Sequence, residues 1–287
     1  MRLWLNDSIT IRITGRVIIM LDIKEMKKKA CQLRINTLKL IGEGQAGHTG
    51  GDLSQIDIMT ALFYHVLRHD PHNPKWEMRD RFILSKGHCV EAYYCILADL
   101  GYFAHDMLHT YFKFGTTLIG HPNNKVPGIE ANSGSLGHGL SLGVGMALAA
   151  KMDAKPYNVY VLMGDGELAE GSVWEAAMAA ASYGLDNLCA IIDRNHLQIS
   201  GRTEDTMRLE PLRAKWDAFG FTTAEVDGHD YAQLLDAFEL KSEQPKLVIA
   251  NTIKGKGVSF MEDTAKWHHG VPSAEQMEIA LCELREV

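Results

Sequence analysis

A carboxylate and a carboxamide at the ends of two apolar segments are the side chains of this sequence best placed for chemistry. Asp165 stands between two glycines after the apolar run 160–163, and Asn195 follows the apolar run 188–192. The segment between them is helix-like, and two strands joined by a helical crossover lie parallel, with their carboxyl ends at the same edge. We therefore expect Asp165 and Asn195 to lie close together. Their oxygens suit Mg²⁺ or Ca²⁺ better than zinc, and magnesium often shares its shell with phosphates, so the pair predicts a metal–diphosphate site.

Four histidines stand beside glycines in loops where predicted elements begin or end. They are His48, His88, His121 and His269. Glycine lets the backbone approach a ligand closely, and imidazole donates hydrogen bonds to hydroxyl and phosphate oxygens. His268 adjoins His269, and the sequence alone does not separate the two. No quartet of Cys and His residues has the spacing of zinc ligands, so zinc is not expected.

The elements that would position these side chains alternate between strand-like and helical patterns. Residues 24–41 have apolar side chains at helical spacing, and Ser273 followed by Gln276 is typical of a helix N-terminus. The expected strands are the run before 85–88, 160–163, 188–193, 221–226 and 247–252, and the expected helices are 54–68, 140–151, 209–219, 231–240 and a last one from 274. This alternation predicts an α/β fold, a doubly wound parallel sheet with helices on both faces. Such sheets bind ligands at the carboxyl edge of their strands.

Composition narrows the class of protein. The chain has 287 residues, 46% of them hydrophobic, and a net charge of −7 without a compensating basic cluster, so we expect no nucleic-acid partner. No apolar stretch approaches the ~20 residues that a membrane span needs, so no membrane partner is expected. Five cysteines without a CxxC pair are typical of reduced thiols, which favours a cytoplasmic protein.

The first nineteen residues fit the later pattern poorly. Met20 directly precedes the first well-patterned helix and is an alternative to Met1 as the natural start. Our hypothesis is that residues 1–19 are a non-native upstream extension and that residues 20–287 form a single domain.

The pair of glycines around Asp165, followed by Asn195, resembles the thiamine diphosphate fingerprint of transketolase-type enzymes. The resemblance is to a fold that binds the diphosphate, and it implies Mg²⁺ (or Ca²⁺) ligated by Asp165, Asn195 and the carbonyl of Leu197. It implies catalytic roles for His48 and His269, which would line the channel to the reacting carbon. The implied cofactor-binding residues are His88, His121, Gly134, Ser135, Leu136, Gly164, Asp165, Gly166, Glu170, Asn195 and His269. His138 replaces a glutamine that is common in the family's loop.

The resemblance also implies a partner chain. In transketolases the glutamate that activates the cofactor lies in a second, pyrimidine-binding domain, and the resemblance covers only the N-terminal section of a full enzyme. Glu170 belongs to the diphosphate side and is not that glutamate. We therefore expect one subunit of a split transketolase, active with a C-terminal subunit, in an α₂β₂ assembly. The reaction would move a two-carbon ketol unit from a ketose phosphate to an aldose phosphate.

Two other classes of function remain open at this point. The chain could be the alpha-type subunit of another thiamine diphosphate enzyme, a 2-oxo acid dehydrogenase or a deoxyxylulose phosphate synthase. It could also be a non-catalytic subunit or a purely structural α/β module. The loops around His48, His88 and His121 favour transketolase, and the glycines beside Asp165 argue against a structural role.

Overall fold

Five parallel strands form the central sheet of the protein, whose computed structural model describes residues 3–5, 8–13 and 16–285. Their order is β4-β5-β6-β10-β9, and each neighbouring pair is parallel. The strands span Arg81–Leu84 (β4), Val159–Gly164 (β5), Leu188–Arg194 (β6), Thr222–Asp227 (β9) and Lys246–Asn251 (β10). The predicted fold class is confirmed.

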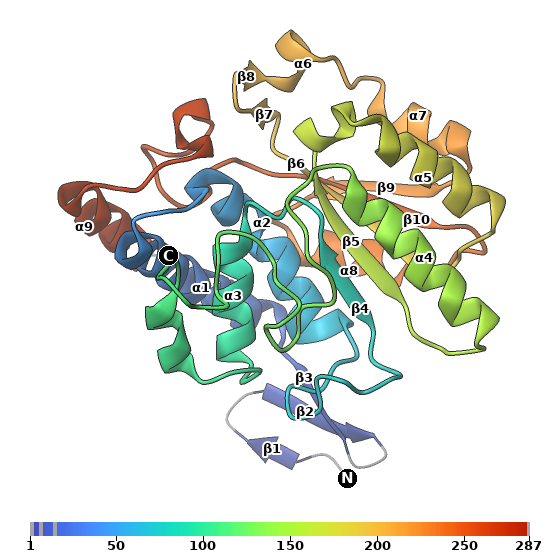
Figure 1. Cartoon of the computed structure of the whole chain (residues 1–287), viewed down its shortest axis with the longest axis horizontal. Helices are drawn as coiled ribbons and strands as arrows, with labels where there is room; N and C mark the ends of the chain where they lie inside the picture. Colours follow the sequence, from blue (N-terminus) through green and yellow to red (C-terminus); the bar gives the residue numbers. More distant parts are fainter. Residues whose placement is uncertain (1–2, 6–7, 14–15, 286–287) are drawn as a thin grey trace.

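Helices cover both faces of this sheet (Figure 1). One layer contains α1 (Ile23–Gly44), α2 (Thr49–Ala61), α3 (Val90–Asp99) and α8 (Tyr231–Glu239). The opposite layer contains α4 (His138–Met152), α5 (Gly171–Ser182) and α7 (Leu212–Phe219). Helix α9 (Ala274–Glu283) packs beside α1. A capping box of Ser273 and Gln276 starts α9, as the sequence predicts.

The two helical layers divide the core into two clusters. Along β5, Tyr160 and Leu162 belong to the cluster under α1, α2, α3 and α8, whereas Val161 and Met163 belong to the cluster under α4, α5 and α7. Alternate side chains of a strand point to opposite faces, so a strand between two layers must be apolar throughout. This is why β5 and β6 appear in the sequence as unbroken apolar runs.

Helix α2 begins at Thr49, five residues before the expected start at Ser54. Gly50 and Gly51 argue for a loop on propensity alone. In the structure a Cβ on Gly50 would lie 2.7 Å from the carbonyl oxygen of Trp267, and one on Gly51 would lie 2.5 Å from the sulfur of Cys89. Gly50 and Gly51 therefore form the first turn of the helix, at positions where the neighbouring segments leave no room for a side chain.

A small antiparallel sheet stands apart from the central one, at the N-terminal end of the chain (Figure 1). Its strands are β1 (Leu3–Leu5), β2 (Ser8–Ile13) and β3 (Arg16–Met20), in the order β1-β2-β3. The sequence analysis did not predict it. Met1 lies outside the described residues.

The carboxyl ends of β4, β5, β6 and β10 meet at one edge of the sheet, and the loops that follow them gather there. Among these loops is the hairpin of β7 (Leu197–Gln198) and β8 (Gly201–Arg202). No helix in the described ranges has the length and apolar character needed to cross a membrane.

Candidate functional site

A cleft of about 450 Å³ opens at this carboxyl edge. The loops after β4, β5, β6 and β10 and the start of α2 contribute to its walls. Its lining includes the predicted residues His48, His88, Gly134, Leu136, Gly164, Asp165, Gly166, Asn195 and Leu197, together with Lys86, Glu167, Gln198, Lys254 and His268. Most of the residues singled out from the sequence thus line one cavity.

Asp165 occupies the end of β5 and is almost completely buried. Its Oδ1 accepts a hydrogen bond from the amide of Gly166 (2.8 Å), and its Oδ2 accepts one from the amide of His196 (2.6 Å) and one from Arg194 (3.2 Å). Burial and the neighbouring carboxylate of Asp193 raise the pKa of Asp165 to about 6, although Arg194 acts in the opposite direction. Additional positive charge at this position would favour the ionised carboxylate.

The turn after β6 contributes a second and a third residue with a candidate ligand oxygen, Asn195 and Leu197, to the same cleft. Asn195 Oδ1 accepts from the amide of Leu197 (3.1 Å), and His196 between them has a φ of 64°, in the left-handed region. The Leu197 carbonyl oxygen lies 3.3 Å from Lys254 Nζ. Because His196 also donates its amide to Asp165, the turn is fixed against the end of β5.

This donor set fits a hard divalent cation. A carboxylate, an amide oxygen and a main-chain carbonyl are oxygen ligands of the kind that Mg²⁺ and Ca²⁺ take. Within the described part of the chain, no three His, Cys, Asp or Glu side chains converge as metal ligands. A cation here would therefore depend on Asp165 with neutral oxygens and on ligands from outside the chain.

Asp193 organises the floor of the cleft at the end of β6. Its Oδ2 lies 2.5 Å from Lys86 Nζ and accepts from Ser54 Oγ (2.6 Å), and its Oδ1 accepts from the hydroxyl of Thr252. Burial alone would raise the pKa of Asp193, but Lys86 and these donors hold it below its ordinary value. Lys86 Nζ also donates to the carbonyl of Gly51 (2.8 Å), so one ion pair joins β6, the β4 loop and α2.

Four imidazole rings form a cluster, and three of them, those of His48, His88 and His268, line the cleft. The ring centroid of His48 lies 4.9 Å from that of His88, 5.6 Å from that of His268 and 4.8 Å from that of His269. Thr49 Oγ1 donates to the carbonyl of Gly270 (2.6 Å), which ties the segment carrying His48 to the segment carrying the last two histidines.

Three of these rings are predominantly neutral near pH 7. Burial, the largest cause, lowers the pKa of His48 to about 4 and that of His268 to about 3, and nearby positive charges act in the same direction. Burial likewise lowers the pKa of His88 well below its ordinary value. A neutral imidazole has one donor and one acceptor nitrogen, so these rings can accept hydrogen bonds as well as donate them.

Comparison with protein families identifies this arrangement. Residues 25–284 match the family model described as transketolase, thiamine diphosphate binding domain. The chain belongs to the transketolase family.

Two kinds of transketolase relative match this chain. It is 50% identical to one subunit of an apulose-4-phosphate transketolase from Phocaeicola vulgatus, over 93% of this chain and 96% of the relative. It is 42% identical to one subunit of a 6-deoxy-6-sulfo-D-fructose transketolase from Clostridium sp., over 91% of this chain and 97% of the relative. It is 38% identical to human transketolase, of which it spans only 41%.

Solved transketolase structures share the fold. The crystal structure of transketolase from Campylobacter jejuni superposes with a TM-score of 0.88 at 32% identity, over 92% of this chain and 43% of that one. The enzyme from Leishmania mexicana gives a TM-score of 0.86 at 29% identity, over 93% of this chain and 42% of that one.

Some residues expected at a transketolase cofactor site lie outside the cleft lining. Ser135 and Glu170 are exposed, and Ser135 lines a separate shallow hollow beside α4. His269 is exposed as well, whereas its neighbour His268 is half-buried and lines the cleft. His121 packs beside Gly134, where a Cβ would lie 2.8 Å from the imidazole ring, so its ring forms part of the support behind that loop.

The sequence analysis assigned no role to several cleft residues of this transketolase chain. Lys86 and Asp193 belong to segments that were singled out, but their ion pair joins two strands that are far apart in the sequence. Lys254 contacts Leu197, which is also far from it in the sequence. Glu167 is buried, and its carboxylate accepts from Ser85 Oγ and from the amides of Gly137 (2.8 Å) and Gly164 (3.0 Å). The sequence feature that could have identified these residues is a charged side chain inside an otherwise apolar or glycine-rich segment.

Proposed function

We propose that this chain is the diphosphate-binding subunit of a two-subunit, thiamine diphosphate-dependent transketolase. The enzyme would transfer a two-carbon ketol unit reversibly from a ketose phosphate to an aldose phosphate. The observation that carries the proposal is the cleft itself, in which a carboxylate, an amide and a carbonyl oxygen lie beside a cluster of histidines. The names of the relatives favour transketolase over a 2-oxo acid dehydrogenase or a deoxyxylulose phosphate synthase.

Each part of the cleft has a distinct task in this proposal. Asp165, Asn195 and the carbonyl of Leu197 would hold Mg²⁺ (or Ca²⁺), whose charge offsets that of a diphosphate. Gly134, Gly164 and Gly166 would let the cofactor approach the backbone closely, and Leu136 would contact it with an apolar side chain. When bound, thiamine diphosphate supplies the nucleophilic carbon and the electron sink for carbon–carbon bond cleavage.

The histidines would handle the oxygen atoms of the sugar. The lowered pKa values of His48 and His268 keep both rings neutral at physiological pH, so each can donate a hydrogen bond to a substrate oxygen or accept one from a substrate hydroxyl. His88, whose ring packs against both, would orient them. We propose His268 in the role that the sequence assigned to His269, because His268 lines the cleft and His269 is exposed.

The partner would be a chain of the transketolase C-terminal type. Two relatives that are named as transketolase subunits match this chain over 96% and 98% of their own lengths, which supports a two-chain enzyme. We propose an α₂β₂ assembly in the cytoplasm, where the buried thiols of Cys89, Cys95 and Cys189 would stay reduced. Residues 20–287 would form the diphosphate-binding domain, with residues 1–19 as an extension.

Calorimetry of the reconstituted pair tests the cofactor site. Asp165→Ala should abolish measurable thiamine diphosphate binding, because it removes the charged metal ligand. Asp153→Ala, at an exposed carboxylate after α4, is the matched control and should leave affinity unchanged. Unchanged affinity in Asp165→Ala would refute the proposed site.

Assays with a ketose phosphate and with a 2-oxo acid as donor would separate transketolase from the related enzymes, and absence of both activities would indicate a non-catalytic subunit.

A further inference from the structure

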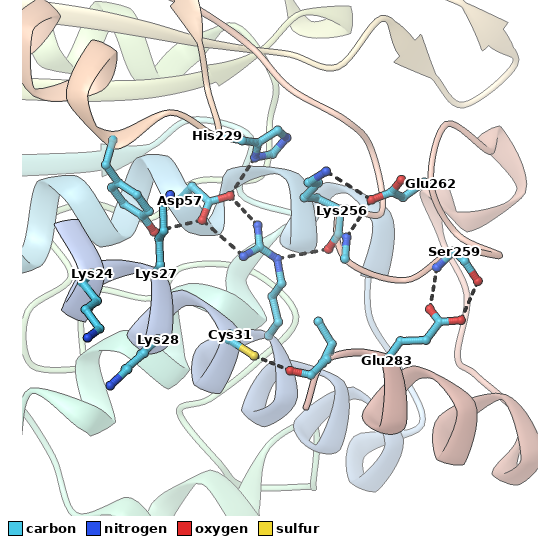
Figure 2. A pocket seen from close by; sticks show the side chains of 14 residues that line it. Lys24, Lys27, Lys28, Cys31, Asp57, His229, Lys256, Ser259, Glu262 and Glu283 are labelled. Atoms are coloured by element: carbon cyan, nitrogen blue, oxygen red, sulfur yellow. Dashed lines mark hydrogen bonds and ion pairs between the residues drawn. The ribbon is translucent and has the colours of Figure 1, made fainter. Parts of the chain in front are cut away.

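A buried charge cluster lies beside the loop that follows β10. Its members are Arg34 of α1, Asp57 of α2, and His229 and Tyr231 at the start of α8. They form part of the wall of a second hollow, of about 860 Å³. Figure 2 shows His229 and the Asp57 carboxylate pointing toward each other, while Lys24 and Lys28 of α1 point away from Asp57.

Asp57 accepts hydrogen bonds from three side chains. Arg34 donates from both terminal nitrogens (2.5 and 3.2 Å), His229 donates from Nδ1 (2.7 Å), and Tyr231 donates its hydroxyl (2.9 Å). The side chains of Arg34 and Asp57 are each 8% exposed. Burial alone would raise the pKa of Asp57, but Arg34 and His229 hold it below its ordinary value.

Two members of the cluster also bind the main chain of the loop after β10. His229 Nε2 accepts from the amide of Ile253 (2.9 Å), so the ring proton must be on Nδ1, facing Asp57. Arg34 Nε donates to the carbonyl of Lys256 (3.0 Å). Ile253 and Lys256 are the two ends of one turn, closed by a hydrogen bond from the Lys256 amide to the Ile253 carbonyl (3.2 Å). The cluster therefore holds this turn at both ends.

The turn carries one residue into the cofactor cleft. Lys254, its second residue, lines the cleft, and its Nζ lies 3.3 Å from the carbonyl oxygen of Leu197 and 3.3 Å from Nδ1 of His268. Lys254 is 3% exposed, so its ammonium has few alternative positions. The amide of Gly255, the next residue, donates to the Gly50 carbonyl (2.9 Å), which fixes the same turn against α2.

We propose that His229, backed by Asp57 and Arg34, is a positioning residue for Lys254: it fixes the Ile253–Lys256 turn and thereby the place of the Lys254 ammonium in the cleft. The inference rests on the proposed function, since it assigns Lys254 a role in a cofactor site. His229 does not itself line the cleft. Its effect on the cofactor must therefore pass through the turn.

The test is a double-mutant cycle between His229 and Lys254 in the reconstituted pair. His229→Ala should weaken thiamine diphosphate binding about fivefold, the effect of one lost buried hydrogen bond, with the KM for sugars unchanged. In a Lys254→Met background the same change should have no further effect on cofactor affinity. His229→Phe, which keeps a planar ring but makes neither hydrogen bond, replaces His229→Ala if removal of the ring unfolds the protein.

Hydrogen exchange on the unliganded chain gives a second readout that needs no cofactor. Amides of residues 253–256 should exchange about fivefold faster in the His229 variant. Tyr231→Phe is the matched control, because it removes a hydrogen bond to Asp57 without touching the turn, and it should change neither exchange nor affinity.

The outcomes separate this inference from the proposed function. Additive effects of the His229 and Lys254 changes on cofactor affinity, or unaltered exchange of the turn, would overturn the positioning role alone. Failure of the unaltered pair to bind thiamine diphosphate would overturn the proposed function and this inference with it.

Discussion

Two adjacent histidines near the end of the chain have different surroundings. His268 lines the cleft, and its Nδ1 lies 3.3 Å from Lys254 Nζ. His269 is exposed, although its ring still lies beside that of His48. His268 and His269 belong to the same sequence motif, so the sequence does not distinguish them. The direction of the backbone in the turn Ala265–His268 determines which ring faces the cavity.

Single substitutions should distinguish the two histidines. His268→Ala should lower kcat/KM on the order of a hundredfold, because it removes a donor and acceptor aimed at the reacting oxygens. His269→Ala should lower it by less than about threefold, as expected for an exposed side chain. Steady-state kinetics of the reconstituted pair measure both, and the reverse ranking would restore His269 to the catalytic role.

A pair of buried carboxyl groups lies next to the segment that carries His48. Asp52 in α2 and Glu91 in α3 are each at most 1% exposed, and their carboxyl groups interact electrostatically. Glu91 also accepts from the hydroxyl of Tyr111 (2.5 Å), and Asp52 accepts from the amide of Ala92 (2.9 Å). Lys86 contributes positive charge near Asp52.

This pair should make the protein less stable as the pH rises. Burial raises the pKa of both groups, and their proximity adds to the rise for Asp52, so the folded chain keeps a proton that the unfolded chain releases. Stability from that proton is complete below the ordinary carboxyl range and is lost as pH rises toward the higher folded pKa, with a slope of up to about 1.4 kcal/mol per pH unit.

Glu91→Gln should flatten that slope, since an amide can donate to Asp52 without titrating. Thermal unfolding of both proteins from about pH 5 to pH 9 measures the difference. Glu43→Gln, at an exposed carboxylate paired with His109, is the control. A slope that is the same in Glu91→Gln and the unaltered chain would show that the pair does not hold the extra proton.

At the scale of single residues, the sequence predicted those site residues that belong to a local motif. Asp165 and Asn195 were found because each follows an apolar run that must be a strand, and their meeting follows from the parallel crossover. The Lys86–Asp193 ion pair could not be found in this way, because its partners follow or end different strands, β4 and β6, and neither residue fixes the other's position in the sequence.

At the scale of elements, the two glycines within helix α4 have different explanations. On helix propensity alone, a glycine is unfavourable at either position. Gly143 packs against strand β5, where an added Cβ would lie 2.4 Å from a methyl group of Val161. No described atom outside the helix's own backbone and the neighbouring residues lies within 4 Å of a Cβ built on Gly145, which is exposed.

Alanine substitutions should therefore have opposite effects. Gly143→Ala should destabilise the chain by about 1–3 kcal/mol, because the extra methyl overpacks a full interior. Gly145→Ala should stabilise the isolated chain by up to about 1 kcal/mol, because alanine is the better helix former. Urea unfolding of the isolated subunit measures both free energies. Destabilisation by Gly145→Ala would show that this glycine has no room for a methyl group in solution.

The predicted elements agree with the structure wherever hydrophobic periodicity was long. The five strands and the helices of both layers were expected, apart from α3 and α5, which the sequence placed only as helical segments after His88 and after Asp165. The largest discrepancy in a predicted helix start is that of α2. That start depends on Trp267 and Cys89, two residues far from Gly50 and Gly51 in sequence, so propensity alone could not reveal it. The small N-terminal sheet was missed because residues 1–19 were interpreted as an extension outside the α/β pattern.

At the scale of the whole molecule, the cleft is open on one side. Ile199 in the β7–β8 hairpin lines the cleft and is nevertheless 76% exposed. A cofactor bound here would be in contact with this chain on one side and with solvent on the other. The proposed partner chain would cover that open side and supply the group that activates the cofactor.

This arrangement makes cofactor binding and subunit pairing reciprocal. If both subunits contact thiamine diphosphate, adding the partner should raise cofactor affinity at least about tenfold, and saturating cofactor should tighten the subunit pair by the same factor. Calorimetry of the isolated chain and of the pair gives the first factor, and sedimentation with and without cofactor gives the second.

Ile199→Ser should reduce the pairing affinity because it removes an apolar side chain that the partner would bury, whereas Met152→Ser, at an exposed position at the far end of α4, should not. Equal cofactor affinity in the isolated chain and in the pair would contradict a shared site, because a cofactor that contacts both subunits must bind the pair more tightly. Unequal factors from calorimetry and sedimentation would contradict the reciprocity itself.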